Sequence, residues 1–315
     1  MQWISPSALS ARGMLGMNRR NIDYIGRYNR RELYPLVDNK LQTKLLAEEH
    51  GVPTPRLQFV LSEQHEIRES EDRLANTQSF VLKPAKGSGG KGILVVTGRE
   101  GDAFIKSSGA KLTMSDLRRH MSNSLAGLYS LSGAPDVVIA EDVIAFDPEF
   151  AGYSYEGVPD IRIIVFKGYP VMAMLRLATH ASDGKANLHQ GAIGVGLAMD
   201  SGRCLHAVQY GRRCSVHPDT GQRLGDIRIG NWHELLLLAA RCYEMTGLGY
   251  MGTDLVLDAE RGPQLLELNA RPGLSIQVAN DRGLLPRLRL IEGRRERRQV
   301  PPDERVAYAM AAFSD

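Results

Sequence analysis

The chain has 315 residues, with 39 Lys and Arg against 36 Asp and Glu, so its formal net charge is only +3. This small excess argues against binding to a polyanion, and we expect no nucleic-acid partner. Apolar residues make up 43% of the chain and charged residues 24%, which is typical of a globular protein and excludes a disordered or fibrous one.

The predicted elements begin after an arginine-rich N-terminal segment, residues 1–37, which shows no clean periodicity. A helix is predicted from Asp38, and Gly51 and Pro53 end it. Further along, the patterns predict strands over 56–61, 80–83, 93–97, 136–140, 161–166, 170–178, 253–257 and 264–269, and helices over 116–128 and 232–246. Residues 292–315 form a charged, weakly helical tail. Strands, hairpins and helices mix without a repeat, so the predicted class is α+β, with the main domain over 38–291.

The compartment is predicted from what the chain lacks. No apolar run reaches the roughly 18 residues that a membrane helix needs, and the first residues do not form a signal peptide. The three cysteines, Cys204, Cys214 and Cys242, are widely spaced and odd in number, which indicates reduced structural thiols. We therefore expect a cytoplasmic protein with no membrane partner.

A glycine-rich loop joins two predicted strands within residues 80–96. Gly87, Gly89 and Gly92 fit G-x-G-x-x-G, but a strand follows where a dinucleotide-binding site needs a helix. Lys91 is followed by Gly92 and not by Ser or Thr, which excludes a Walker loop. What remains is a flexible hairpin whose amides can fold over phosphates, with positive charge from Lys83, Lys86 and Lys91. An ordinary glycine hairpin stays open as the alternative.

Two carboxylates are predicted to face each other near the C-terminus. Glu267 and Asn269 lie two apart on a strand and so point to one face. If the turn over 259–262 sets the register, Asp254 lies opposite Glu267, and two such carboxylates repel. A hard cation would relieve that repulsion, and these oxygen ligands suit Mg²⁺. The alternative is a solvent-facing polar stripe, which the adjacent Arg271-Pro272-Gly273 makes less attractive.

Two arginines lie on the arms of the hairpin predicted over 161–178. Arg162 and Arg176 have the fork geometry that holds carboxylate or phosphate oxygens. Taken singly, each is more commonly a surface residue.

These blocks, in this order, resemble the ATP-grasp superfamily and, within it, the RimK-like α-L-glutamate ligases. The resemblance spans about residues 38–275. It is carried by Asp38-Asn39-Lys40, residues 51–55, the loop 83–92, residues 139–144, Asp160-Ile161-Arg162, residues 187–192 and residues 267–273. It implies an ATP-grasp fold, in which two α+β subdomains grip ATP, with a glycine-loop subdomain over about 55–142.

The resemblance also implies a site. By the resemblance, magnesium ligation falls to Asp254, Glu267 and Asn269. The catalytic roles come from the expected mechanism: Arg271 is placed to steady the acyl-phosphate charge, and Arg162 or Arg176 to hold a substrate carboxylate. ATP binding falls to Lys40, Lys83, Lys86, Gly87, Ser88, Gly89, Gly90, Lys91, Glu141, Asp142, Val143, Asp160, Lys185 and Asn187. The cofactors implied are ATP and Mg²⁺, with two ions expected and Mn²⁺ as an alternative metal.

The chain departs from the family pattern in three places. The usual full N-terminal domain does not precede Lys40, Asp142 replaces an aromatic residue, and Arg271 replaces a serine. The missing domain commonly frames the acceptor site, and the hypothesis is that the arginine-rich segment takes over that role. Solvated flanks or oligomer contacts are the alternative.

The function that these observations favour is an ATP-dependent carboxylate–amine ligase working through an acyl phosphate. The expected partners are an amino acid, glutamate, and an amine acceptor that is a peptide, a protein or a small metabolite; a homo-oligomer stays open. A phosphotransferase and a non-enzymatic nucleotide-binding module are the rivals. The first would need kinase catalytic motifs that are absent from the sequence, and the second would not need an intact metal site.

Overall fold

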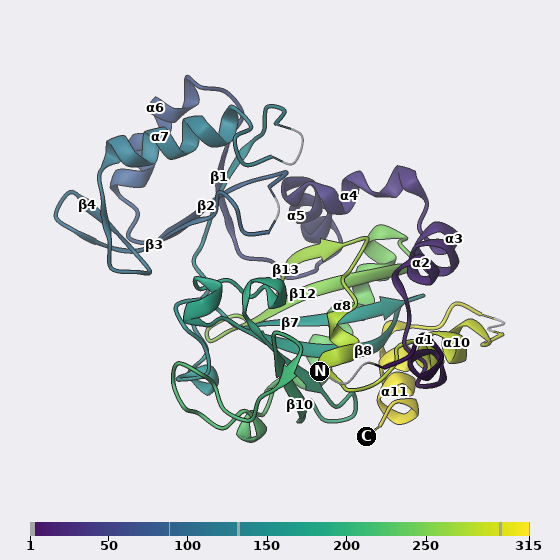
Figure 1. Cartoon of the computed structure of the whole chain (residues 1–315). Helices are drawn as coiled ribbons and strands as arrows, with labels where there is room; N and C mark the ends of the chain where they lie inside the picture. Colours follow the sequence, from purple (N-terminus) through teal and green to yellow (C-terminus); the bar gives the residue numbers. More distant parts are fainter. Residues whose placement is uncertain (1–3, 88, 131–132, 296–297, 315) are drawn as a thin grey trace. The chain divides into compact units, whose positions relative to one another are not determined.

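The computed structural model describes residues 4–314 except 88, 131–132 and 296–297. The chain divides into two compact units (Figure 1). The larger unit contains Met1–Asp38, Leu46–Pro53 and Phe146–Asp315, and the smaller unit contains Asn39–Leu45 and Thr54–Ala145. Among the described residues, no helix is both long and apolar enough to cross a membrane.

The smaller unit is a six-stranded antiparallel sheet with two helices packed on it. Its strands run in the order β1-β6-β2-β3-β4-β5. Their bounds are β1 Leu57–Leu61, β2 Phe80–Pro84, β3 Leu94–Glu100, β4 Ala103–Lys106, β5 Lys111–Leu112 and β6 Val138–Glu141, and the helices are α6 Glu66–Ala75 and α7 Met114–Leu125. Leu117 and Met121 of α7 are buried against Phe80 and Leu82, so one face of the sheet forms the core.

The larger unit is built on a seven-stranded antiparallel sheet in the order β11-β10-β9-β8-β7-β12-β13. The bounds are β7 Asp160–Phe166, β8 Tyr169–Leu177, β9 Ile193–Leu197, β10 Cys204–Gln209, β11 Arg212–Arg213, β12 Tyr250–Asp258 and β13 Gly262–Asn269. The predicted β7–β8 hairpin is confirmed, and its turn at Lys167 and Gly168 has φ of 50° and 80°, which suits the twist of a tight hairpin.

The helices of the larger unit lie on this sheet and beside it (Figure 1). They are α1 Pro6–Ala11, α2 Met17–Arg19, α3 Gly26–Tyr28, α4 Pro35–Asp38, α8 Trp232–Thr246, α9 Ser275–Ala279, α10 Leu285–Glu292 and α11 Pro302–Ala312. Helix α5, Lys40–Glu49, is shared, with its first residues in the smaller unit and its last in the larger one. The helix predicted over 232–246 is confirmed as α8, and Gly247 ends it in a left-handed conformation. Short 3₁₀ turns cover Arg31–Leu33, Pro148–Phe150, His180–Ser182, Leu188–Gln190 and Leu224–Asp226.

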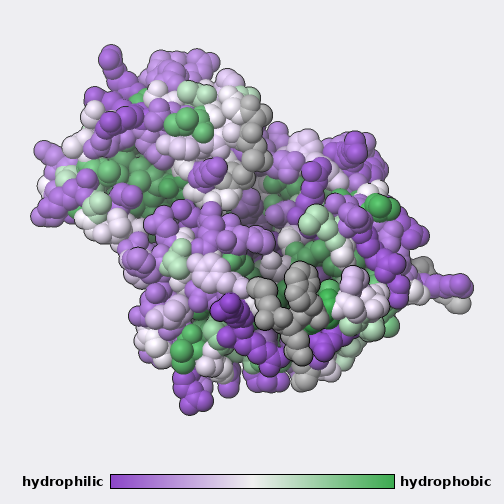
Figure 2. Space-filling model, viewed as in Figure 1, coloured by the Kyte–Doolittle hydropathy of each residue, from purple (hydrophilic) through white to green (hydrophobic). Residues whose placement is uncertain are grey.

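Both ends of the chain contribute to the core of the larger unit. Leu15, Tyr24 and Ile25 from the arginine-rich segment are buried there, and Val306 and Phe313 near the C-terminus are buried with them. These ends therefore hold the larger unit together, in addition to any other role they have. On the face seen in Figure 2, hydrophilic residues predominate and apolar ones form small patches.

Candidate active site

The glycine loop that follows β2 is anchored at its start by Asp136. The Lys86 N–H donates to both carboxylate oxygens of Asp136, at 2.9 and 3.1 Å, and the Ser130 hydroxyl donates to the same carboxylate at 2.8 Å. Asp136 is buried, so these hydrogen bonds satisfy a charge that would otherwise be costly. Asp136 was not predicted as a functional residue, because it stood out only as the first residue of a predicted strand.

The other end of the loop is fixed by His120 and Tyr129. The Gly92 carbonyl oxygen lies 3.0 Å from Nε2 of His120, and burial lowers the pKa of that imidazole. Gly92 has φ of +75°, and a Cβ placed on it would lie 2.5 Å from Cγ of Tyr129. Only glycine meets both requirements at this position.

Between these anchors, the side chains of the predicted phosphate loop are exposed. Lys86 and Lys91 are exposed, as are Gly89 and Gly90 with φ of 63° and 76°. Ser88, also predicted for ATP binding, lies outside the described residues. Gly87 is buried and forms a β-bridge with Ser130. The loop therefore has fixed ends and an exposed tip that carries two cations.

Lys40 contacts this loop from the start of α5. Its Nζ donates to the Gly87 carbonyl oxygen at 2.6 Å, and its backbone N–H donates to the Ala85 carbonyl at 2.9 Å. The structure thus brings two of the predicted phosphate-binding elements, Lys40 and the glycine loop, into direct contact.

A buried carboxylate holds two lysines beside the same loop. Glu141, only 3% exposed, forms ion pairs with Lys83 and with Lys44, the latter at 2.9 Å. Lys44 also donates to the Pro55 carbonyl. Burial lowers the pKa of Lys44, although the Glu141 charge opposes that change. The cluster carries one net positive charge inside the smaller unit, which suits an anionic ligand.

Lys44 is a candidate that the motif analysis missed. The available signal was its spacing, since Lys40 and Lys44 are four apart on a helix and so lie on one face. The other predicted adenine contacts are less engaged with this cluster. The Asp142 N–H donates to the Arg56 carbonyl at 3.0 Å, its carboxylate pairs with the Arg56 guanidinium, and Val143 follows the end of β6.

In the larger unit, the predicted pairing of Asp254 with Glu267 is confirmed, but the turn is shorter than predicted, residues 259–261, and a β-bulge between Asp254 and Leu255 shifts the register. Asp254 lies opposite Glu267, and Gly252 lies opposite Asn269. Asp254 is buried and Glu267 is half-buried. The Asn269 carboxamide oxygen accepts from the Arg271 N–H at 2.8 Å, so the turn that carries Arg271 begins at one of the predicted metal ligands.

Asp254 is held by two arginines, Arg162 from the adjacent strand β7 and Arg176 from β8, one strand further along the sheet. Arg162 forms a two-pronged pair with it, Nε to Oδ1 and Nη2 to Oδ2, the second at 2.6 Å. Nη2 of Arg176 donates to the same Oδ2 at 2.7 Å. Arg176 also forms a two-pronged pair with Asp160, Nε to Oδ1 and Nη2 to Oδ2, the second at 2.8 Å. Two carboxylates and two guanidinium groups therefore form one buried, neutral network.

The network changes the pKa values of its carboxyl groups in opposite directions. Burial raises the pKa of Asp160, and Arg176 only partly offsets this effect. Burial acts in the same sense on Asp254, but Arg162 and Arg176 outweigh it and lower the pKa of that carboxyl. Asp254 is consequently the more firmly ionised of the two.

These arginine contacts remove the charge repulsion from which a cation between Asp254 and Glu267 was predicted. We expected the facing pair of Asp254 and Glu267 to need a bound cation, but the arginines already compensate the Asp254 charge. Among the described residues, no three His, Cys, Asp or Glu side chains gather as a metal-binding group. The predicted set contains only two carboxylates and an amide, and its oxygen donors still have the chemistry that suits Mg²⁺.

The arginine-rich segment supports the turn that carries Arg271. Arg20 Nη1 donates to the Pro272 carbonyl at 2.8 Å, and Asn29 Nδ2 donates to the Ala270 carbonyl at 3.2 Å. The exposed Arg271 guanidinium lies 5.2 Å from the centre of the Tyr34 ring. This contact suits a cation–π interaction.

Two predicted nucleotide contacts lie in a separate loop of the larger unit. Lys185 pairs with Asp183 at 2.9 Å. The Asn187 side chain caps the short turn Leu188–Gln190 by accepting from the His189 N–H at 3.0 Å. Each has a local structural partner in this structure.

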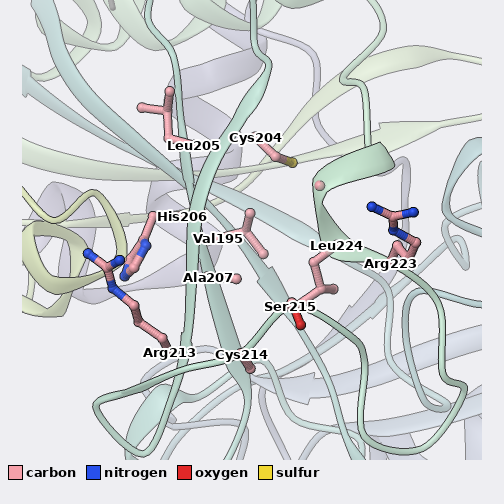
Figure 3. A pocket seen from close by; sticks show the side chains of 11 residues that line it. Val195, Cys204, Leu205, His206, Ala207, Arg213, Cys214, Ser215, Arg223 and Leu224 are labelled. Atoms are coloured by element: carbon pink, nitrogen blue, oxygen red, sulfur yellow. The ribbon is translucent and has the colours of Figure 1, made fainter.

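A cavity of about 440 Å³ opens at the β9–β10 edge of the larger sheet (Figure 3). Its lining includes Val195, Cys204, Cys214, Ser215 and Arg223. None of the predicted site residues lines this cavity. All three cysteines of the chain are free, in agreement with the expectation of reduced thiols.

The α+β architecture, with two units each built on an antiparallel sheet, is that of the ATP-grasp superfamily, as the sequence predicted. The chain belongs to the sugar-transfer associated ATP-grasp family, whose model matches residues 19–293. A search of curated proteins finds no match. The α-L-glutamate branch of the superfamily stays a prediction.

Solved structures with a similar fold have low sequence identity. D-alanyl-alanine synthetase A from Vibrio cholerae is 12% identical over 90% of this chain and 66% of that one, with a TM-score of 0.48. The ATP-grasp ligase PsnB, complexed with a variant of its minimal precursor, Mg and ADP, is 15% identical over 90% and 61%, with a TM-score of 0.44. A RimK domain ATP-grasp protein from Sphaerobacter thermophilus is 16% identical over 80% and 69%, also with a TM-score of 0.44. The chain thus spans less than two thirds of the length of the first two, 66% and 61%.

Proposed function

We propose that this protein is an ATP- and Mg²⁺-dependent carboxylate–amine ligase that adds L-glutamate to an amine acceptor. The observation that carries the proposal is the β12–β13 hairpin, where Asp254 and Glu267 face each other beside Asn269 and next to two buried arginines. Membership of an ATP-grasp family supports the use of ATP.

The reaction has two steps. A carboxylate oxygen of the amino acid attacks the γ-phosphorus of ATP, the bond from that phosphorus to the bridging oxygen breaks, and ADP leaves. The amine nitrogen then attacks the acyl carbon, the carbon–oxygen bond to phosphate breaks, and the nitrogen loses a proton to solvent. Neither step needs a nucleophilic side chain, so the protein acts by positioning and by charge.

The phosphates are proposed to bind Lys40, Lys83 and the loop 86–92. These groups fit because the loop has anchored ends and because the Glu141 cluster carries a net positive charge. Arg271 is proposed to stabilise the acyl phosphate, and Arg162 and Arg176 to hold a substrate carboxylate. Glu141, Asp142 and Val143 are proposed to bind adenine, and Asp160, Lys185 and Asn187 to complete the nucleotide site.

Asp254, Glu267 and Asn269 are the proposed holders of Mg²⁺, with two ions expected and Mn²⁺ as a substitute. Bound there, the metal would neutralise charge on the transferring phosphoryl group. The chain's own contribution is the register that sets Asp254 opposite Glu267 and the Asn269–Arg271 hydrogen bond that fixes the following turn.

The acceptor amine is the least constrained part of the proposal. Several arginines of the N-terminal segment have acidic partners within the larger unit, such as Arg19 with Asp23 at 3.5 Å and Arg27 with Glu292 at 3.0 Å. This local pairing favours a structural role for the segment over recruitment of an acidic acceptor. Because the family is described as sugar-transfer associated, amino sugars belong among the amines to be tested, beside peptides and small metabolites.

The test is an initial-rate assay of ADP release with the purified chain. A ligase should release ADP only when a carboxylate and an amine are both present, and mass spectrometry with labelled glutamate should detect the amide product. Release with a hydroxyl acceptor alone would instead indicate a phosphotransferase. Nucleotide binding without turnover under every combination would indicate a binding module.

A further inference from the structure

We propose that Arg162 and Arg176 compete with the divalent metal for Asp254 and thereby set the metal affinity of this chain. The inference rests on the proposed function, because it takes Asp254 as a metal ligand. It goes further by naming the two arginines with which a metal must compete, at least one of which has to leave the carboxylate.

The first observation is that most hydrogen-bond acceptor positions of the Asp254 carboxylate are occupied. A carboxylate offers about four acceptor positions, and three N–H groups of the two arginines already donate to Asp254. The contact with Arg162 is two-pronged, which is the strongest geometry for an arginine–carboxylate pair. A metal ion therefore cannot bind Asp254 through both oxygens while these hydrogen bonds persist.

The second observation is burial. The side chains of Arg162, Arg176 and Asp254 are only 9%, 14% and 8% exposed. Solvent screens such charges little, so a divalent cation placed at Asp254 would face two guanidinium groups at close range. Binding is favourable only if at least one guanidinium moves away from the carboxylate.

The third observation is that the network offers Arg176 a second partner. Arg176 keeps its two-pronged contact with Asp160 when it leaves Asp254. A guanidinium released from Asp254 is free to hold a carboxylate or phosphate oxygen, so metal binding would deliver the arginines to the substrate.

The experiment measures Mn²⁺ binding to the full chain without nucleotide or substrate, by electron paramagnetic resonance of the free ion. Arg162→Lys keeps the charge but loses the fork, so we expect Mn²⁺ to bind about tenfold more tightly, or about 1.4 kcal/mol. The matched control is Arg213→Lys, the same change at an exposed arginine of the larger unit that pairs with Asp281 at 2.6 Å. The control should shift the dissociation constant by less than about twofold, because charge is conserved and the Arg213 guanidinium binds Asp281 and not Asp254.

Two results would overturn the inference. One is an unchanged dissociation constant in a folded Arg162→Lys protein, and the other is equal tightening in Arg213→Lys. A wild-type protein that binds no Mn²⁺ would remove the metal site of the proposed function as well, whereas binding with unaltered affinity would remove the competition alone.

A second measurement uses the wild-type protein and does not depend on the folding of a variant. The Arg162 Nε–H group is buried in its hydrogen bond to Asp254, so its proton should exchange slowly with solvent. Saturating Mg²⁺ should accelerate that exchange and shift the Nε resonance. An unchanged resonance at saturating metal would show that Arg162 stays on Asp254, which contradicts the proposal.

Discussion

Replacing Gly92 with alanine should destabilise the glycine-loop hairpin much more than the same change at Gly89. Both residues have positive φ, 75° and 63°, so each alanine would pay about 1–2 kcal/mol for a left-handed backbone. At Gly89 nothing lies within 4 Å of the new Cβ. At Gly92 the Cβ would lie 2.5 Å from Cγ of the Tyr129 ring.

The extra cost at Gly92 follows from overpacking. Inserting a methyl group into a packed site typically costs about 1–3 kcal/mol, so Gly92→Ala should cost about 2–5 kcal/mol in all. Because the chain has two units, we would measure native-state hydrogen exchange of the β2 and β3 amides in place of a global melt. The apparent Km for ATP should rise in parallel if the loop covers phosphates.

Equal destabilisation by the two substitutions would refute this reasoning, since only the ring contact distinguishes them. A second arm tests that contact directly. Tyr129→Ala should recover most of the excess cost in the Gly92→Ala background, and its own effect is measured in the wild-type background. A double-mutant cycle with no coupling would show that the ring is not the cause.

Three further predictions follow from the site and the thiols. Glu267→Gln should abolish ligase turnover and weaken Mn²⁺ binding while circular dichroism stays unchanged, because one of two proposed carboxylate ligands is lost; wild-type turnover would contradict the metal assignment. Trypsin cleavage within residues 86–92, whose lysines are exposed, should be suppressed by a non-hydrolysable ATP analogue, and equal cleavage with and without it would count against a phosphate-covering loop. Burial raises the pKa of Cys204 and Cys242 to about 12 and raises that of the half-buried Cys214. Since only the thiolate reacts, a thiol reagent at pH 8 should label Cys214 first and slowly, faster as the pH rises, and should reach the other two only in denaturant; early labelling of Cys242 would contradict its burial.

The parts of the fold that could be predicted are those that local pattern determines. Helix α8 has a continuous apolar face and a glycine at its end, and the β7–β8 and β12–β13 hairpins have short turns that pair their strands, although a β-bulge later shifts the register in each. Helix α6 was missed because its ten residues bury only Ile67, Ser70 and Leu74 among many charges.

Other helices and strands were not predicted because their sequences break the regular helical or strand repeat. In the N-terminal segment, a π-helical turn over Arg20–Ile25 interrupts the helix, so the buried Tyr24 and Ile25 do not follow a 3.6-residue repeat. Strand β9 contains Gly194 and Gly196, which weaken a strand pattern. Both glycines are needed for close packing, since a Cβ at Gly196 would lie 2.4 Å from the Ala279 carbonyl oxygen.

In the candidate site, too, contacts set by a local turn could be predicted and contacts between distant segments could not. The pairing of Asp254 with Glu267 was predictable because a short turn joins their strands, although that turn spans only residues 259–261 and a β-bulge between Asp254 and Leu255 brings Asp254 opposite Glu267. The pairing of Asp254 with Arg162 was not, because the two residues are 92 positions apart and no turn sets the register between β12 and β7. That register decides which charge faces the carboxylate, and it replaces the expected repulsion by a neutral network. If Asp254 is a metal ligand as proposed, metal binding there would exchange one cation for another, and the two arginines would matter to the metal affinity as much as the ligands do.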